Sequence, residues 1–137
     1  MDAIDSAIAD LVTLASAHDA SRTVERLKSL LSQKGIQLFA DIDHAAGARQ
    51  VGLLLRPTRV LIFGNPAAGT PLMQDEQTIG LDLPLRILVW EDADGKAWLT
   101  YRQSESLAEL HPIHGRDGTL KALSAGLSAL AHGAAGP

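Results

Sequence analysis

A β-hairpin signal in residues 85–102 constrains the fold of this chain more than any other feature. Two apolar-rich segments of strand length, 85–91 and 96–102, flank residues 92–95, which read Asp-Ala-Asp-Gly. An Asp-Gly pair between two such segments is typical of a hairpin turn, because glycine adopts the backbone angles that the turn needs. We therefore expect two adjacent antiparallel strands here.

Both faces of this predicted hairpin are apolar. A simple four-residue turn pairs Val89 with Trp98 and Leu88 with Leu99. One layer of helices covers only one face of a sheet, so the second face needs another cover. Either the C-terminal helix and the long loop of the same chain or a second copy of the chain is expected to supply it. The simple register places Leu85, Ile87, Val89 and Trp98 on one face, and Leu88, Trp90, Ala97, Leu99 and Tyr101 on the other.

Apolar periodicity predicts most of the other elements. Leucine and valine recur at helical spacing in residues 20–34, and leucine does so again in residues 120–130. Alternating apolar and polar residues predict a strand over 36–43, and a short helix follows over 44–52. An apolar run predicts a buried strand over 59–63. The chain thus mixes helices and strands throughout its length.

Two segments have less definite patterns. Residues 10–16 fit either a strand or the end of a helix. Residues 64–84 are rich in glycine, proline and polar side chains, which predicts mostly loop with one helical turn after Pro66. A loop of this length is unusual in a small domain and is often functional.

Composition excludes several classes of function. The chain has 137 residues, 46% of them hydrophobic, which suits a single domain over residues 1–137. Its net charge of −4 provides no basic surface for nucleic acid, and no apolar run is long enough to span a membrane. The absence of cysteine excludes disulfide scaffolds and thiol chemistry. The amino terminus does not read as a secretory signal, so we expect a cytoplasmic location.

Several short segments, taken in order and at their spacing, resemble the domain of unknown function 302 family. The resemblance spans about residues 10–115 and implies a compact α+β domain in which 10–16 is the first strand. It also implies a homodimer, and it implies no established activity. The segments are Ile42-Asp43-His44, Leu55-Arg56-Pro57-Thr58, Phe63-Gly64-Asn65-Pro66, Gly69-Thr70-Pro71-Leu72-Met73 and Leu81-Asp82-Leu83-Pro84-Leu85, with Val89-Trp90-Glu91, Asp94-Gly95 and Tyr101 in the hairpin.

The fold expected from these observations is a two-layer α+β domain. We expect a sheet of about five mostly antiparallel strands with helices on one face. The family-like core is expected to extend over about residues 10–132.

Asp43 and His44 are the candidate catalytic residues. They stand at a predicted junction of strand and helix, where side chains commonly line a cleft, and Asp41 lies two residues before them. A histidine oriented by a carboxylate can act as a general base or a metal ligand. The alternative is that Asp43 simply caps the following helix. Capping by Asp43 does not require a histidine at position 44.

Gly64, Asn65 and Thr70 are candidate ligand-binding residues. Glycine permits an unusual turn, asparagine caps helices, and Pro66 suits a first helical position, so local structure explains most of this segment. With Gly69 and Thr70, the same segment can present N–H groups and a hydroxyl to a small anion. The spacing and the missing lysine do not fit a nucleotide-binding P-loop.

Asp82 and Arg86 complete the candidate ligand-binding set. Asp82 either caps a turn or lies next to a site, and Arg86 either neutralises it or contacts a ligand. His111 and His114 are expected to lie in a solvated linker, because no nearby carboxylate completes a metal site. No metal site is predicted, and the cofactor stays unknown.

Three hypotheses about function follow. The first is a domain that binds a small, anionic ligand in a cleft near Asp43, His44, Asn65 and Thr70. The second is a small enzyme that uses His44 with Asp43. The third is a protein–protein interaction module that works through its apolar sheet face.

Overall fold

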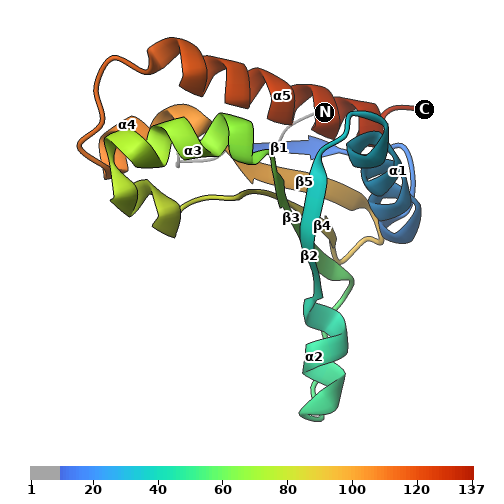
Figure 1. Ribbon diagram of the computed structural model, residues 1–137. Helices are drawn as coiled ribbons and strands as arrows, with labels where there is room; N and C mark the ends of the chain where they lie inside the picture. The colour runs from blue at the N-terminus through green and yellow to red at the C-terminus, as the bar shows by residue number, and fades with distance from the viewer. Residues whose placement is uncertain (1–9) are drawn as a thin grey trace.

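The computed structural model describes residues 10–137 as one antiparallel sheet with helices on one side (Figure 1). The five strands run in the order β1-β5-β4-β3-β2, which confirms the predicted two-layer α+β fold. Segment 10–16 is a strand, as the family resemblance implies. The elements are β1 (Leu11–Ala15), α1 (Ala20–Gln33), β2 (Gln37–Asp43), α2 (His44–Gln50), β3 (Thr58–Gly64), α3 (Pro66–Asp75), the 3-10 helix η1 (Gln77–Leu81), β4 (Leu85–Glu91), β5 (Ala97–Arg102), the 3-10 helix η2 (Ser104–Ser106), α4 (Leu107–Leu110) and α5 (Asp117–Ala135).

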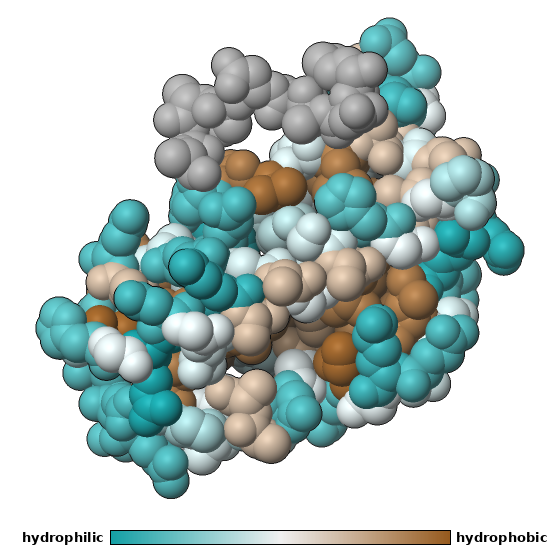
Figure 2. All heavy atoms as spheres, turned by 90° about the horizontal axis from the view of Figure 1, so that it is seen from above, coloured by the Kyte–Doolittle hydropathy of each residue, from teal (hydrophilic) through white to brown (hydrophobic). Residues whose placement is uncertain are grey.

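The main core lies between the sheet and the two long helices, α1 and α5. Apolar spacing along α1 directs Val24, Leu27 and Leu31 toward the sheet, where each is at most 1% exposed. They meet strand residues such as Phe63 and Leu99, which are equally buried. Seen from above, the helical side carries polar residues around its rim and apolar ones nearer its middle (Figure 2).

The hairpin has a different register from the one that a simple four-residue turn predicts. Val89 pairs with Leu99 and Trp90 with Trp98, so the earlier assignment of side chains to faces is wrong. Gly95, at φ 79°, adds a residue in the left-handed conformation to the turn. A shift of one residue moves every side chain of a strand to the opposite face. Leu99 therefore lies in the core, and Trp98 lies on the outer face beside Trp90.

Residues 64–84 contain more helix than the sequence predicts. Asn65 accepts a hydrogen bond from the backbone N–H of Ala67 at 2.9 Å, and Pro66 begins the ten-residue helix α3. Pro71 lies within that helix. The segment is held by a second apolar cluster that the local pattern does not reveal, made of Leu72, Ile79, Leu107, Ile113 and Leu120.

The face of the sheet that points away from α1 and α5 has no described helix over it (Figure 1). Strand register places apolar side chains from all five strands on this face, and we call it the open face. Trp90 and Trp98 stack there with ring centroids 6.1 Å apart. The apolar residues of the open face are Leu11, Ala15, Ala40, Ile42, Val60, Ile62, Leu88, Trp90 and Trp98.

A projecting segment lies at the end of β2 and β3. We call residues 44–57, which comprise α2 and the chain that follows it, the arm. Figure 1 shows the arm extending from the sheet away from α5. Its tip exposes aliphatic side chains, with Leu54 95% and Val51 71% exposed. Such exposure of neighbouring large apolar side chains is typical of an interaction surface.

Candidate functional site

Asp43 serves as the N-cap of α2. Its carboxylate accepts a hydrogen bond from the backbone N–H of Ala46 at 2.9 Å, so the capping interpretation is confirmed. His44 is exposed and lines none of the four best-formed cavities of residues 10–137. The enzyme hypothesis needs an imidazole that opens into a cavity beside a second polar group. It stays a prediction, and this geometry adds no support to it.

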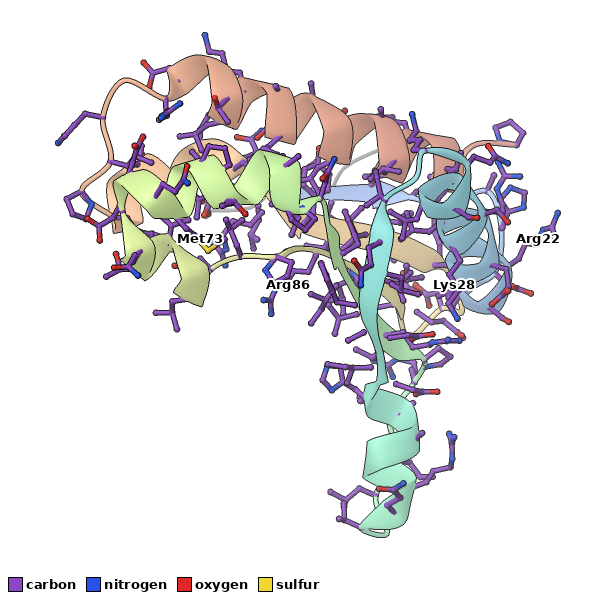
Figure 3. The ribbon with its side chains drawn as sticks, viewed as in Figure 1. Arg22, Lys28, Met73 and Arg86 are labelled. Carbon is purple, nitrogen blue, oxygen red and sulfur yellow. The ribbon has the colours of Figure 1, made fainter. Side chains whose placement is uncertain are left out.

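The Asp41 carboxylate does not bond to His44. It binds two cationic side chains on the helical side of the sheet. Lys28 of α1 lies 2.7 Å from its carboxylate, and the Arg59 guanidinium of β3 contacts both carboxylate oxygens. Figure 3 shows Lys28 on α1. The hydrogen bonds from Arg59, followed by those from Lys28, hold the pKa of Asp41 below its usual value. The pKa of Arg59 is raised by the same carboxylate.

The substitution Asp41→Asn is expected to destabilise the fold only where the carboxylate is ionised. Because the pKa of Asp41 is lowered in the folded state, its contribution is present above the unfolded pKa and is lost as pH falls through the folded pKa. We expect a loss of about 1 kcal/mol at pH 7 and a clearly smaller loss near pH 2, measured by urea unfolding. Asp94→Asn, in the exposed turn, is the control. An equal loss for Asp41→Asn at both pH values would contradict the ion-pair explanation.

Gly64, Asn65 and Thr70 line a common cavity of about 180 Å³. It lies between α3, the start of β2, the segment before β4 and α5. In Figure 3, Met73 points from α3 toward the segment before β4. None of its lining residues is charged, and the carbonyl oxygen of Asn65 is already engaged in capping. The other lining residues are Phe39, Pro66, Ala68, Gly69, Met73, Leu83, Pro84, Leu85 and Leu123.

The two halves of the predicted cleft lie at opposite ends of a strand pair. Gln37 pairs with Gly64 at one end of β2 and β3, and Asp43 pairs with Arg59 at the other. The first and last residues of β2 are six positions apart, which corresponds to roughly 20 Å along the strand. A single cleft bordered by Asp43, His44, Asn65 and Thr70 is therefore contradicted by the strand register.

Asp82 and Arg86 line a second cavity of about 260 Å³, and Pro84 and Leu85 line both this cavity and the first. The Asp82 carboxylate lies 2.6 Å from Nε2 of His111. The prediction that His111 lies in a solvated linker is wrong, since the residue is 8% exposed and its Nδ1 lies 2.9 Å from the hydroxyl of Thr78. His114 is exposed, as expected.

Sequence reasoning missed His111 because its partners are distant in the chain. Asp82 is 29 residues away and Thr78 is 33 residues away. The apolar residues Leu107 and Ile113 stand on either side of this histidine, and both are buried. This pattern in the sequence was the signal that could have indicated a buried His111. Within residues 10–137, no group of three or more histidine and acidic side chains is placed to hold a metal ion.

Comparisons with known proteins find relatives that are longer than this chain. "Fluoride-specific ion channel FluC 1" of Brucella suis biovar 1 (strain 1330) is 46% identical over 127 residues, which are 92% of this chain and 50% of that protein. "Fluoride-specific ion channel FluC 1" of Brucella abortus biovar 1 (strain 9-941) is 46% identical over 92% of this chain and 47% of its own length. The chain thus spans about half the length of these relatives. Across residues 10–137, we find no helix with the length and apolar character that crossing a membrane requires.

A solved structure shares the fold. The uncharacterised conserved protein DUF302 from Bacillus stearothermophilus superposes with a TM-score of 0.83 at 17% identity, covering 93% of this chain and 99% of that one. The family model described as Domain of unknown function DUF302 matches residues 12–130. The chain therefore belongs to the DUF302 family.

Proposed function

We propose that this domain is an association module whose open face docks against the open face of a second copy. The observation that carries the proposal is an apolar sheet face without a helical layer: α1 and α5 pack on one side of the sheet, and no described helix packs on the other (Figure 1). Antiparallel sheets that face water normally carry polar side chains on that face. Here the middle of the face holds Val60, Leu88 and the stacked pair Trp90 and Trp98.

A second copy is the partner that this surface fits best. Two sheets pack face to face about 10 Å apart when both contribute apolar side chains. The central open-face residues Val60 and Leu88 are uncharged, so two copies match apolar surface to apolar surface. Twofold contacts of this kind use the same patch on both subunits. The arm, with Leu54 and Val51 exposed, offers further apolar surface beside the open face.

Sedimentation velocity of the purified chain tests the proposal directly. We expect a species of about twice the 14.5 kDa chain mass at micromolar concentrations. A single species of the chain mass at about 100 μM would contradict an association of useful strength.

The longer relatives extend this proposal. Because the chain spans about half of proteins named as fluoride-specific ion channels, the same association would join two of the longer chains. The proposal gives the domain a role in assembly and assigns it no transport step.

A second candidate function is the binding of a small apolar ligand in the 180 Å³ cavity beside Asn65 and Thr70. A cavity of roughly 150 Å³ lined by apolar side chains accommodates benzene. The observation that favours this function is the lining, which is apolar except for Asn65 and Thr70 at one side. An uncharged lining of this kind supports an apolar ligand rather than the anionic one that the sequence suggested for this segment.

Thermal unfolding with and without benzene or indole tests this second candidate. Saturating probe is expected to raise the melting temperature by about 2 °C, because ligands that bind only the folded state stabilise it. Gly69→Leu places a side chain toward Leu83 and Met73, fills the cavity and should abolish the rise. Gly47→Leu, in open space on α2, is the matched control and should preserve it. No rise with either probe in the unsubstituted chain contradicts this candidate.

A further inference from the structure

An irregularity in β2 places Phe39 beside the apolar cavity. β2 lies at the edge of the sheet and pairs with β3. Leu38 pairs with Phe63 of β3, and the next pair joins Ala40 to Ile62. Phe39 is therefore an extra residue without a partner on β3. Such a β-bulge redirects a side chain, and bulges are frequent next to functional sites. Here the Phe39 side chain lines the cavity of about 180 Å³.

A narrow space lies beside the Phe39 ring and Pro84, at the position of Gly64. A Cβ atom on Gly64 would lie 3.5 Å from Cε2 of Phe39 and 3.5 Å from Cβ of Pro84. Both distances are ordinary van der Waals contacts, so an atom in this position touches both side chains at once. Because glycine has no side chain, the position is available to a ligand. A single layer of carbon atoms can fill it.

The side chains around this space favour a flat aromatic ring. Phe39 is 45% exposed, so part of its ring surface is free to contact a ligand. Aromatic rings attract one another in offset-stacked or edge-to-face arrangements, beyond what the buried area alone contributes. Met73, which also lines the cavity, has a polarisable sulfur that contacts aromatic rings favourably. A saturated ring is thicker than an aromatic one and gains neither interaction.

Two polar side chains of the lining indicate what such a ring carries. The Asn65 carbonyl oxygen caps α3, which leaves the N–H groups of that side chain free. The hydroxyl of Thr70, within α3, forms no hydrogen bond with another of the described residues. A hydroxyl group both donates and accepts hydrogen bonds, so a hydroxyl on the ligand suits either side chain. A charged substituent is disfavoured, because no lining residue is charged.

We propose that this cavity binds a planar aromatic ring that carries a hydroxyl group. The ring lies against Phe39 and Pro84 above Gly64, and its hydroxyl group forms a hydrogen bond with Thr70. This inference rests on the second candidate function and makes its ligand class definite, since an apolar lining alone specifies neither the aromatic ring nor the hydroxyl group. It does not depend on association through the open face.

Isothermal titration of the purified chain with phenol, benzene and cyclohexanol, each in a separate experiment, tests this ligand class. Phenol is expected to bind saturably in the millimolar range, at least about fivefold more tightly than either of the others. Cyclohexanol keeps the hydroxyl group but is not flat, whereas benzene is flat but has no hydroxyl group. Phenol binding no tighter than that of benzene or of cyclohexanol would overturn this inference alone. Absence of binding by every compound would contradict the second candidate function together with it.

Gly64→Ala fills the space with one methyl group. The new Cβ makes only ordinary contacts, and Gly64 does not have a positive φ, so the fold should be retained. Phenol affinity should fall at least about tenfold. Gly126→Ala on α5, where a Cβ meets nothing within 4 Å, is the matched control and should leave the affinity within about twofold. Unchanged phenol affinity in Gly64→Ala, or an equal loss in both variants, would overturn the placement of the ring.

Two further substitutions separate the ring contact from the hydroxyl contact. Phe39→Leu keeps an apolar side chain on the bulge and should weaken phenol and benzene binding about fivefold, with little change for cyclohexanol. Thr70→Val keeps the shape of the side chain and should remove the preference for phenol over benzene. Circular dichroism checks that each variant is folded. An equal loss for every compound in Phe39→Leu would contradict the aromatic contact, and a preference for phenol that persists in Thr70→Val would contradict the hydroxyl contact.

Discussion

A glutamate in place of Leu88 is expected to turn the dimer into a monomer and to weaken association at least about 100-fold. Leu88 lies on the open face between Val60 of β3 and Thr100 of β5. In a face-to-face dimer a carboxylate there would lose its hydration and meet apolar side chains or its own twofold copy. In the monomer the same carboxylate reaches water, because Leu88 is only partly buried. The fold should therefore survive the change while the association does not.

Sedimentation velocity and circular dichroism together measure this result. Leu81→Glu is the matched control, since Leu81 is 82% exposed but lies in η1, away from the open face. The control should remain dimeric. A folded Leu88→Glu chain that associates as strongly as the unsubstituted one would overturn the open-face assignment, and so would an equal loss of association in the control.

Truncating Leu99 to alanine is expected to lower the free energy of unfolding by about 3 kcal/mol. Leu99 is completely buried in the main core, where β5 pairs with both β1 and β4 beneath the helices. The loss combines the hydrophobic transfer free energy of the removed atoms with the cost of the cavity that they leave. A change of this size corresponds to a melting temperature lower by about 10 °C. Urea unfolding monitored by circular dichroism measures it.

Leu53→Ala is the control for this core substitution. Leu53 belongs to the arm and is 63% exposed, so its truncation should change the free energy of unfolding by no more than about 0.5 kcal/mol.

The comparison of Leu99→Ala with Leu53→Ala also tests the hairpin register. With a simple four-residue turn, Leu99 would share a face with Trp90, and its truncation would remove surface contacts. A loss below about 1 kcal/mol would contradict the observed register and its placement of Leu99.

The predicted roles of individual site residues were most accurate where the interaction is local. Asp43 and Asn65 each cap the helix that follows them, and their partners are two or three residues away. Short-range steric preferences and nearby N–H groups determine such contacts, so the sequence contains the information that they need. The grouping of Gly64, Asn65 and Thr70 around one cavity was also predictable, because they follow one another closely in the chain.

The predicted site was least accurate where distant segments meet. The sequence could not show that Asp43 and Asn65 lie at opposite ends of a strand pair, because that depends on strand register. It also could not show that His111 is buried against Asp82 and Thr78. Those contacts depend on how α3 and the segment before α5 pack around a second apolar cluster.

The sequence by itself determined most strands and helices, two helix caps, the family, and a surplus of apolar surface in the hairpin. Local hydrogen bonding and side-chain periodicity operate over a few residues, so each of these can be read from a short segment. Only the tertiary structure decided which apolar residues form the core and which form the open face. One glycine in the left-handed conformation, Gly95, shifts the register by one residue and reverses the faces of the hairpin. Only the folded chain brings Phe39, Gly64 and Pro84 to one cavity, because segments that are distant in the sequence must pack together to create it.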